Sequence, residues 1–187
     1  MKVEDIITHQ LPVWEQLMTS YKKGRMSHAY LFEGSDRSSV KALAVVYTQL
    51  LLCERPEVDR PCGVCRNCER IVHSNHPNVL TVKRETTQIR KEQIEHVIRQ
   101  MSQKGFERGK KVYIIEEADR LNLSAANALL KFLEEPLGDV TAILLTESPA
   151  AILPTIQSRC QRMTLIPPTR ELFCQHLEQS YEMTHSM

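Results

Sequence analysis

A strand, a short loop and a helix follow one another between residues 29 and 52, and this order limits the fold more than any other feature of the chain. The apolar run at residues 29–32 predicts a strand that leads to Gly34. The largely apolar stretch at residues 40–52 predicts the helix that leaves the loop. Strand, loop and helix in this order begin a parallel α/β sheet, at the position where nucleotide-binding proteins hold phosphate.

This loop has the length of a phosphate-binding loop but lacks its chemical residues. A loop of the G-x-x-x-x-G-K-[ST] type needs a second glycine to close its amides on phosphate, a lysine for the β- and γ-phosphates, and a hydroxyl for Mg²⁺. Counted from Gly34, these places are held by Ser39, Val40 and Lys41. Lys41 is one residue late, and a helical step of about 100° turns its stem away from the phosphate site. We therefore expect no ATP here.

Apolar runs and helical patterns alternate along the rest of the chain. We expect the other strands at residues 78–82, 112–115, 141–146 and 161–166. We expect helices at residues 12–24, 89–105 and 124–135, the last with Ser124 as its cap, and a short helical turn at 151–158. Continuous apolar strands that alternate with helices predict a parallel five-stranded sheet covered by helices on both faces.

Pro167 and Pro168 interrupt this alternation. The residues from Thr169 onward predict a helix with an apolar face, which one helix cannot bury by itself. We therefore interpret residues 1–166 as one α/β domain, with a lobe inserted at about 53–76. Residues 167–187 are interpreted as the truncated start of a helical domain.

Length and composition exclude several classes of protein. A chain of 187 residues, 42% hydrophobic and 25% charged, can bury the core of an ordinary soluble domain. No stretch approaches the roughly 20 apolar residues of a membrane span, and the N-terminus lacks the apolar region of a signal peptide. We expect a cytoplasmic protein without membrane contact. The formal net charge of +1 gives no global attraction to nucleic acid, so DNA contact would be local or made by a partner.

Four cysteines within sixteen residues predict a metal site. They are Cys53, Cys62, Cys65 and Cys68, with the spacing C-x8-C-x2-C-x2-C. Four thiols so placed can converge at the Zn–S distance of roughly 2.3 Å. The alternatives are disulfides, which a cytosolic compartment disfavours, and unliganded buried thiols, which would not cluster in a Pro/Gly/Arg-rich loop. Four thiolates leave no open coordination position, so the expected zinc is structural.

Two adjacent carboxylates follow the expected strand at residues 112–115. Glu116 and Glu117 stand where P-loop ATPases place the Mg²⁺-holding acid and the water-activating acid. The alternative is a strand that runs into solvent and ends in two exposed glutamates. These residues alone leave the two interpretations open.

The remaining candidates carry weaker signals. Arg159 follows a short helical turn, where an arginine usually faces water or caps carbonyl groups, and we expect it to be exposed and outside ion-pair networks. We interpret His73 and His76 as loop or cap residues, because four cysteines already complete a zinc site. Cys160 and Cys174 stand alone and are interpreted as packing residues.

Six segments, in this order, resemble bacterial clamp-loader subunits of the AAA+ class. They are HAYLFEG at 28–34, PCGVCRNC at 61–68, HPNV at 76–79, KVYIIEEAD at 111–119, AANALLKFLEEP at 125–136 and SRCQ at 158–161. The resemblance covers nearly the whole chain. Two types of DNA polymerase III subunit carry these segments: the gamma/tau type keeps an intact phosphate loop, whereas the delta-prime type commonly does not. The altered loop favours the delta-prime type.

The resemblance implies a non-hydrolysing subunit of the DNA polymerase III holoenzyme, without intrinsic ATPase activity. It would assemble with gamma/tau and delta subunits to load the sliding clamp on primed DNA in replication, and contact DNA mainly through the complex. Arg159 would act in trans, as an arginine finger at the γ-phosphate held by a neighbouring gamma/tau subunit. Glu116 and Glu117 would be remnants of a metal-binding strand end, and Thr146, at the nucleotide-sensing position, only a cap. Residues 167–187 would begin the helical lid.

Two other interpretations stay open. An active gamma/tau-like ATPase motor would need Lys41 as its phosphate lysine, and the surviving acid pair leaves residual nucleotide affinity open. An independent zinc-dependent DNA-binding module would need a basic patch around the cysteines. The charges there balance instead: Arg55, Arg60, Arg66 and Arg70 stand against Glu54, Glu57, Asp59 and Glu69.

Overall fold

Five parallel strands form one sheet. The computed structural model describes residues 3–102, 109–135 and 138–167. The strand order is β2-β3-β4-β1-β5, and all neighbouring strands run parallel. The strands are β1 (Ala29–Glu33), β2 (Val79–Val82), β3 (Lys111–Ile115), β4 (Val140–Thr146) and β5 (Gln161–Thr164). The predicted parallel five-stranded sheet is confirmed, although β5 is shorter than expected.

β1, β3 and β4 end at the same edge of the sheet. β1 and β4 are buried along their whole length, as expected of central strands covered on both faces. Leu31 lies opposite Leu144, and Leu144 lies opposite Ile115. The amide of Gly34 donates to the carbonyl of Thr146 at 3.2 Å. The loop after β1 and the residues after β3 and β4 therefore meet at the carboxyl edge.

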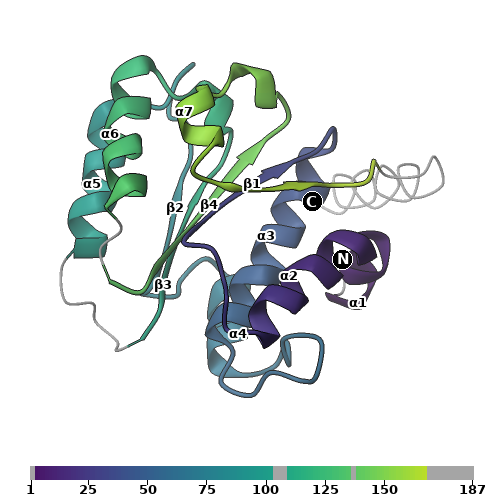
Figure 1. The fold of residues 1–187 in the computed structure, drawn as a ribbon. Helices are drawn as coiled ribbons and strands as arrows, with labels where there is room; N and C mark the ends of the chain where they lie inside the picture. Colours follow the sequence, from purple (N-terminus) through teal and green to yellow (C-terminus); the bar gives the residue numbers. More distant parts are fainter. Residues whose placement is uncertain (1–2, 103–108, 136–137, 168–187) are drawn as a thin grey trace, which may run out of the picture.

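Helices cover both faces of the sheet (Figure 1). One face carries α1 (Val3–His9), α2 (Leu11–Lys22) and α3 (Arg37–Leu52), and the other carries α5 (Lys91–Ser102), α6 (Leu123–Glu134) and α7 (Pro154–Gln157). Each face has its own cluster of buried apolar side chains. Tyr30 and Phe32 of β1 pack with α1 to α3, and Leu31 packs with α5 to α7, because alternate residues of a strand point to opposite faces.

The cap of α6 and the start of α5 differ from the sequence prediction. α6 is capped by Asn122, whose side-chain oxygen accepts the amide of Ala125 at 2.8 Å, and not by Ser124. Ser124 lies inside the first turn, where its side chain cannot take the cap position. Ile89 lies before α5 and forms a bridge to Leu121 instead of joining the helix. The predicted turn at 151–158 is a 3-10 turn, η2 (Pro149–Ala151), followed by α7.

The inserted lobe contains a helix that the sequence analysis did not predict, α4 (Arg66–Val72). Several hydrogen bonds tie the lobe to the α/β domain, and two of them reach α2 and α3. The indole nitrogen of Trp14 donates to the carbonyl of Asp59 at 2.8 Å, and the side-chain amide of Gln49 donates to the carbonyl of Cys68 at 3.1 Å. The lobe is therefore held against α2 and α3.

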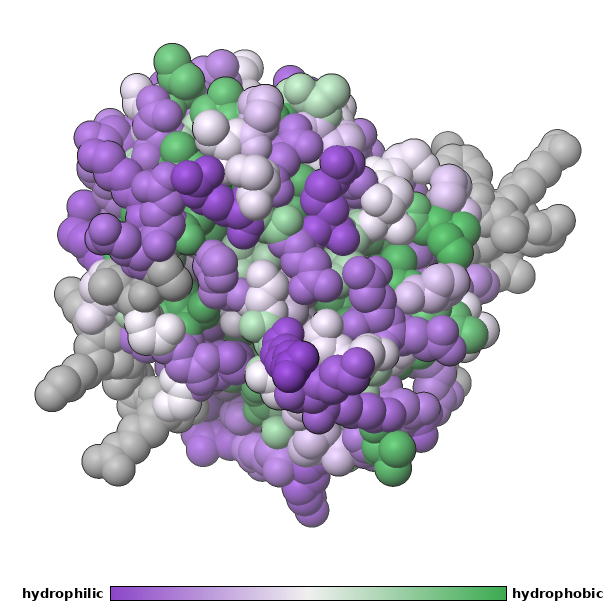
Figure 2. Space-filling view, viewed as in Figure 1, coloured by the Kyte–Doolittle hydropathy of each residue, from purple (hydrophilic) through white to green (hydrophobic). Residues whose placement is uncertain are grey.

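Exposed apolar side chains are scattered over the described surface. Val58, Val64 and Val72 of the lobe are among them. On the face drawn in Figure 2, hydrophilic residues predominate between small apolar patches. No helix within the described ranges is long and apolar enough to cross a membrane.

The end of the predicted α/β domain lies at the limit of the described residues. Pro167 is the last of them, so Pro168, the predicted helix from Thr169 onward and Cys174 lie outside. Residue 105, the predicted end of the helix that contains α5, also lies outside. The division at 166/167 and the lobe boundaries at 53–76 stay predictions.

Candidate functional site

The loop after β1 packs closely against Val40 and Leu165 of the core at its first residue, Gly34. A Cβ atom at Gly34 would lie 3.0 Å from Cγ2 of Val40 and 3.1 Å from Cβ of Leu165, so a side chain there would push these two residues out of place. Val40, which stands in the place of the phosphate lysine, is 2% exposed and belongs to the core cluster beside α3. Val40 therefore anchors the loop by apolar packing.

Asp36 occupies the anion position at the start of α3. In phosphate-binding loops, the free amides of the first helical turn bind phosphate. Here Oδ2 of Asp36 accepts a hydrogen bond from the amide of Ser39 at 2.8 Å and another from the hydroxyl of Ser39. This cap also explains why α3 begins at Arg37, before the predicted residue 40. The Asp36 carboxylate thus accepts a hydrogen bond from a backbone amide that would otherwise be free to bind phosphate.

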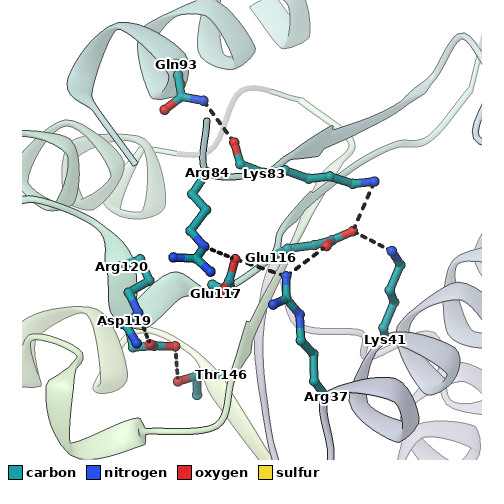
Figure 3. Close-up of polar contacts among 10 residues, drawn as sticks. All are labelled: Arg37, Lys41, Lys83, Arg84, Gln93, Glu116, Glu117, Asp119, Arg120 and Thr146. Atoms are coloured by element: carbon teal, nitrogen blue, oxygen red, sulfur yellow. Dashed lines mark hydrogen bonds and ion pairs between the residues drawn. The ribbon is translucent and has the colours of Figure 1, made fainter. Parts of the chain in front are cut away.

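Glu116 is buried, Glu117 is half-buried, and both are ion-paired (Figure 3). Their side chains are only 6% and 12% exposed, so the alternative of two glutamates in solvent is wrong. Nζ of Lys41 lies 3.0 Å from Oε1 of Glu116, and Nζ of Lys83 lies 3.8 Å from the same oxygen. Nη2 of Arg37 lies 3.0 Å from Oε2 of Glu117, and Nε of Arg84 lies 2.9 Å from it.

The Lys41 side chain reaches Glu116, and the prediction that its stem turns away from a phosphate site stays a prediction. Arg37 and Lys41 are four residues apart, so they share one face of α3. The lysine side chain is long enough to reach Glu116 although Lys41 lies one residue beyond the position of the phosphate lysine. The space lined by Arg37, Lys41, Glu116, Glu117 and Thr146, among others, has a cavity volume of about 20 Å³. That is room for about one water molecule.

The polar contacts continue from Glu117 to the end of β4. Glu117 has a φ of 54°, in the left-handed region that residues other than glycine rarely adopt, and it precedes the 3-10 turn η1 (Ala118–Arg120). Oγ1 of Thr146 donates to Oδ1 of Asp119 at 2.8 Å, and the amide of Ser148 donates to Oγ1 of Thr146 at 2.9 Å. Thr146 thus caps the exit of β4, as expected.

Sequence reasoning missed Asp36 and the cations Arg37, Lys83 and Arg84. An aspartate directly before a helical pattern is a cap signal that could have been found. Lys83 and Arg84 follow β2, and Val82 of β2 lies opposite Ile115 of β3. The pairing of β2 with β3 is what brings Lys83 and Arg84 beside Glu116 and Glu117. The sequence alone has no signal that predicts these ion pairs.

The four cysteines of the lobe converge on one point. Their Sγ atoms all lie within 4.8 Å of one another, with Cys53 at 3.5 Å from Cys62 and 4.0 Å from Cys65. A tetrahedron of sulfurs around zinc has S–S distances of about 3.8 Å. The predicted cluster is confirmed, and its dimensions are compatible with zinc.

Backbone amides point at these sulfurs. The amide of Cys62 donates to Sγ of Cys53 at 3.4 Å. Burial acts to raise the pKa of Cys65, but hydrogen bonds from the amides of Cys68 and Glu54, together with those of the Cys68 and Cys62 side chains, lower it to about 7. Burial raises the pKa of Cys53 and of Cys68. The amides therefore favour the thiolate that a metal ion needs, against the effect of burial.

The other sulfur and imidazole groups have packing or capping roles. His73 ends α4 as its C-cap residue, and Nδ1 of His76 accepts the amide of Asn78 at 3.1 Å. Cys160 packs against the core cluster beside α5 to α7, and burial raises its pKa to about 12. This agrees with the interpretation of all three as structural residues.

Arg159 lies at the opposite edge of the sheet from the acid pair. It directly precedes Cys160 and β5, at the amino edge, whereas Glu116 and Glu117 follow the carboxyl end of β3. Its side chain is 35% exposed. Nη1 donates to the carbonyl of Thr155 at 2.9 Å, and Nη2 pairs with Oε1 of Glu134 at 2.6 Å. The expectation that it stands outside ion pairs is wrong, because α6 ends beside it.

The chain is similar in sequence to subunits of DNA polymerase III. The family model described as DNA polymerase III, delta subunit, matches residues 9–169. The DNA polymerase III subunit delta' of Bacillus subtilis (strain 168) is 43% identical over 155 residues, which cover 83% of this chain and 47% of that protein. The subunit delta' of Escherichia coli (strain K12) is 33% identical over 162 residues, 86% of this chain and 48% of that protein. The chain spans about half the length of these curated relatives.

Solved structures share the fold at low sequence identity. A DNA polymerase III gamma-subunit-related protein of Thermotoga maritima superposes with a TM-score of 0.57 at 23% identity, over 84% of this chain and 47% of that one. A mutant of Thermotoga maritima RuvB gives a TM-score of 0.54 at 14% identity, over 97% of this chain and 51% of that one. The described domain has the AAA+ P-loop-type fold.

Proposed function

The chain belongs to the family described as DNA polymerase III, delta subunit, and on this premise we propose that it is a clamp-loader subunit that does not hydrolyse ATP. Within the family, its similarity to delta-prime subunits extends over 79% to 88% of the chain. It assembles with gamma/tau ATPase subunits and a delta subunit. The complex loads the sliding clamp on primed DNA, and the chain touches DNA mainly through that complex.

One observation carries the non-hydrolysing role: the nucleotide position is filled by the chain's own residues. Asp36 takes an amide at the start of α3, Val40 is buried where the phosphate lysine would stand, and Arg37 crosses to Glu117. The space between Arg37, Lys41, Glu116, Glu117 and Thr146 is about 20 Å³, which holds about one water molecule and not a triphosphate. Binding of ATP would require several of these contacts to break together.

Arg159 acts in trans on the ATP site of a neighbouring gamma/tau subunit. Its position at the amino edge of the sheet supports this role, because Glu116, Glu117 and the nucleotide position of its own chain lie at the other end of the parallel strands. An arginine finger neutralises charge that develops on the transferred phosphoryl group and is worth about 10³ to 10⁵ in rate in other nucleotide hydrolases. Glu116 and Glu117 are remnants of a metal-binding strand end.

A structural zinc ion holds the lobe. Cys53, Cys62, Cys65 and Cys68 supply four sulfurs and leave no open position for catalysis. Trp14 of α2 and Gln49 of α3 donate hydrogen bonds to the lobe, so a lobe ordered by zinc also stabilises the packing of these two helices.

Calorimetry of the purified chain with Mg²⁺ and ATP tests the non-hydrolysing role. We expect no saturable heat up to about 1 mM ATP, because ion pairs and the Asp36 cap compete for Arg37, Lys41 and the Ser39 amide, which could otherwise hold the triphosphate. Binding in the micromolar range that Lys41→Ala abolishes would instead support the alternative of a gamma/tau-like motor. Lys22→Ala, at the end of α2, is the matched control for the loss of a lysine.

A further inference from the structure

Arg159 is held at two points by its own chain. Nη1 donates to the carbonyl of Thr155, within the last turn of α7, at 2.9 Å. Nη2 pairs with Oε1 of Glu134 at 2.6 Å. Because Glu134 is the last residue of α6, this pair joins the ends of two helices that are far apart in the sequence.

The two anchors use one N–H of each terminal nitrogen, Nη1 and Nη2, and leave the Nε–H and the second N–H of each terminal nitrogen. A guanidinium carries five N–H donors in a planar fork. Within the described residues, its other near contact is Oγ of Ser158 at 3.5 Å. No other described residue accepts from the guanidinium, so its remaining donors can bind a group on an adjacent subunit, in a plane that the two anchors fix. A single bond to Thr155 would leave the fork free to rotate about that bond.

We propose that Glu134 is a positioning residue for Arg159, which it holds ready for a phosphate on the adjacent subunit. This rests on the proposed action of Arg159 in trans. A long side chain that is mobile before docking loses rotamer freedom when it engages, and this loss opposes the productive geometry. Glu134 removes part of that loss in advance, because the guanidinium is already fixed when the neighbour arrives.

The role of Glu134 is geometric more than electrostatic. Both side chains are partly exposed, 35% for Arg159 and 44% for Glu134, and an ion pair in such a position gains little Coulomb energy. What the pair supplies is an acceptor oxygen at a fixed place. A glutamine offers the same oxygen without the charge, so Glu134→Gln should keep the position of Arg159, whereas Glu134→Ala should lose it.

DNA-stimulated ATP turnover by the complete complex, with gamma/tau and delta subunits and primed DNA, tests this. We expect Glu134→Ala to lower kcat about three- to tenfold, with the KM for ATP within twofold of the unmodified complex, because ATP is bound by the neighbour. Glu134→Gln should restore kcat to within twofold. Glu135→Ala removes the same charge one residue later, from an exposed residue without an ion pair in the described part of the chain, and should leave kcat unchanged.

A double-mutant cycle separates positioning from a structural effect. In a complex that already carries Arg159→Ala, Glu134→Ala should cause no further loss, because there is no guanidinium left to hold. A further loss there, an unchanged or raised kcat for Glu134→Ala alone, or an equal loss for Glu135→Ala would overturn the positioning role. If Arg159→Ala itself leaves turnover unchanged, the action in trans fails and the positioning role fails with it. If Arg159→Ala lowers turnover but Glu134→Ala does not, only the positioning role fails.

Discussion

At the residue scale, Asp36 places a carboxylate where a phosphate-binding loop places phosphate. The amide and the hydroxyl of Ser39 both donate to it. Asp36 therefore satisfies an amide of the first helical turn that would otherwise lack an intrahelical partner. Asp36 therefore both occupies an amide that could bind phosphate and caps the start of α3.

Replacement of Asp36 tests this cap. We expect Asp36→Ala to lower the free energy of unfolding by about 1 kcal/mol, the usual cost of a lost N-cap, measured by urea denaturation. Ser38→Ala changes an exposed residue of the same turn and should stay within about 0.5 kcal/mol of the unmodified chain. Equal stability of Asp36→Ala and the unmodified chain would mean that the cap contributes nothing.

At the scale of single elements, α4 ends in a left-handed residue that is not glycine. Ser74 has a φ of 55°, its amide donates to the carbonyl of Ile71, and the amide of Asn75 donates to the carbonyl of Arg70. This pair of hydrogen bonds is the Schellman arrangement, in which glycine is preferred at the left-handed position.

Ser74→Gly should therefore raise the free energy of unfolding by about 0.5 to 1 kcal/mol, because it relieves the contact between Cβ and the backbone. Ala128→Gly, inside α6, should lower it by about 1 kcal/mol, since glycine is unfavourable in a helix interior. Thermal or urea unfolding of both variants checks that the free energy of unfolding rises for Ser74→Gly and falls for Ala128→Gly. Destabilisation by Ser74→Gly would contradict the strain assigned to Ser74.

The lobe gives a second prediction at this scale. Elemental analysis should find one zinc per chain, and Cys65→Ser should lose it and destabilise the lobe, because the binding free energy, on the order of 10 kcal/mol for such sites, is available only to the folded state. Cys160→Ser removes a thiol outside the cluster and should keep the metal. Full zinc content in Cys65→Ser, or none in the unmodified chain, would contradict a four-cysteine site.

At the scale of the whole molecule, local patterns predicted the elements, and tertiary packing determined the polar contacts. The strands, α3 and the cysteine cluster each have a local signal in the sequence. The strands are apolar runs, α3 is a largely apolar helical stretch, and the cysteine cluster has the spacing of a metal site. The ion pairs of Glu116 and Glu117 depend on which strands are neighbours, since Lys83 and Arg84 follow β2 and Arg37 follows β1. Short helices such as α4 are stabilised mainly by packing, so their sequences carry a weak signal.

Arg159 illustrates the same limit. Its motif was visible in the sequence, but its partner Glu134 lies 25 residues earlier and meets it only because α6 and α7 end side by side. The sequence prediction of an exposed, unpaired arginine was therefore wrong about its surroundings. Its role in trans stays a prediction.

The action of Arg159 in trans is tested most directly by DNA-stimulated ATP turnover of gamma/tau subunits assembled with the unmodified subunit or with its Arg159→Ala variant. We expect the variant to assemble and keep its zinc but to lower turnover by at least about tenfold, because charge on the transferred phosphoryl group loses its partner. Arg159→Lys should rescue poorly, since lysine lacks the planar fork. Arg99→Ala, at an exposed arginine of α5, should have no effect. Turnover by Arg159→Ala equal to that of the unmodified complex would contradict the role in trans and leave an architectural subunit.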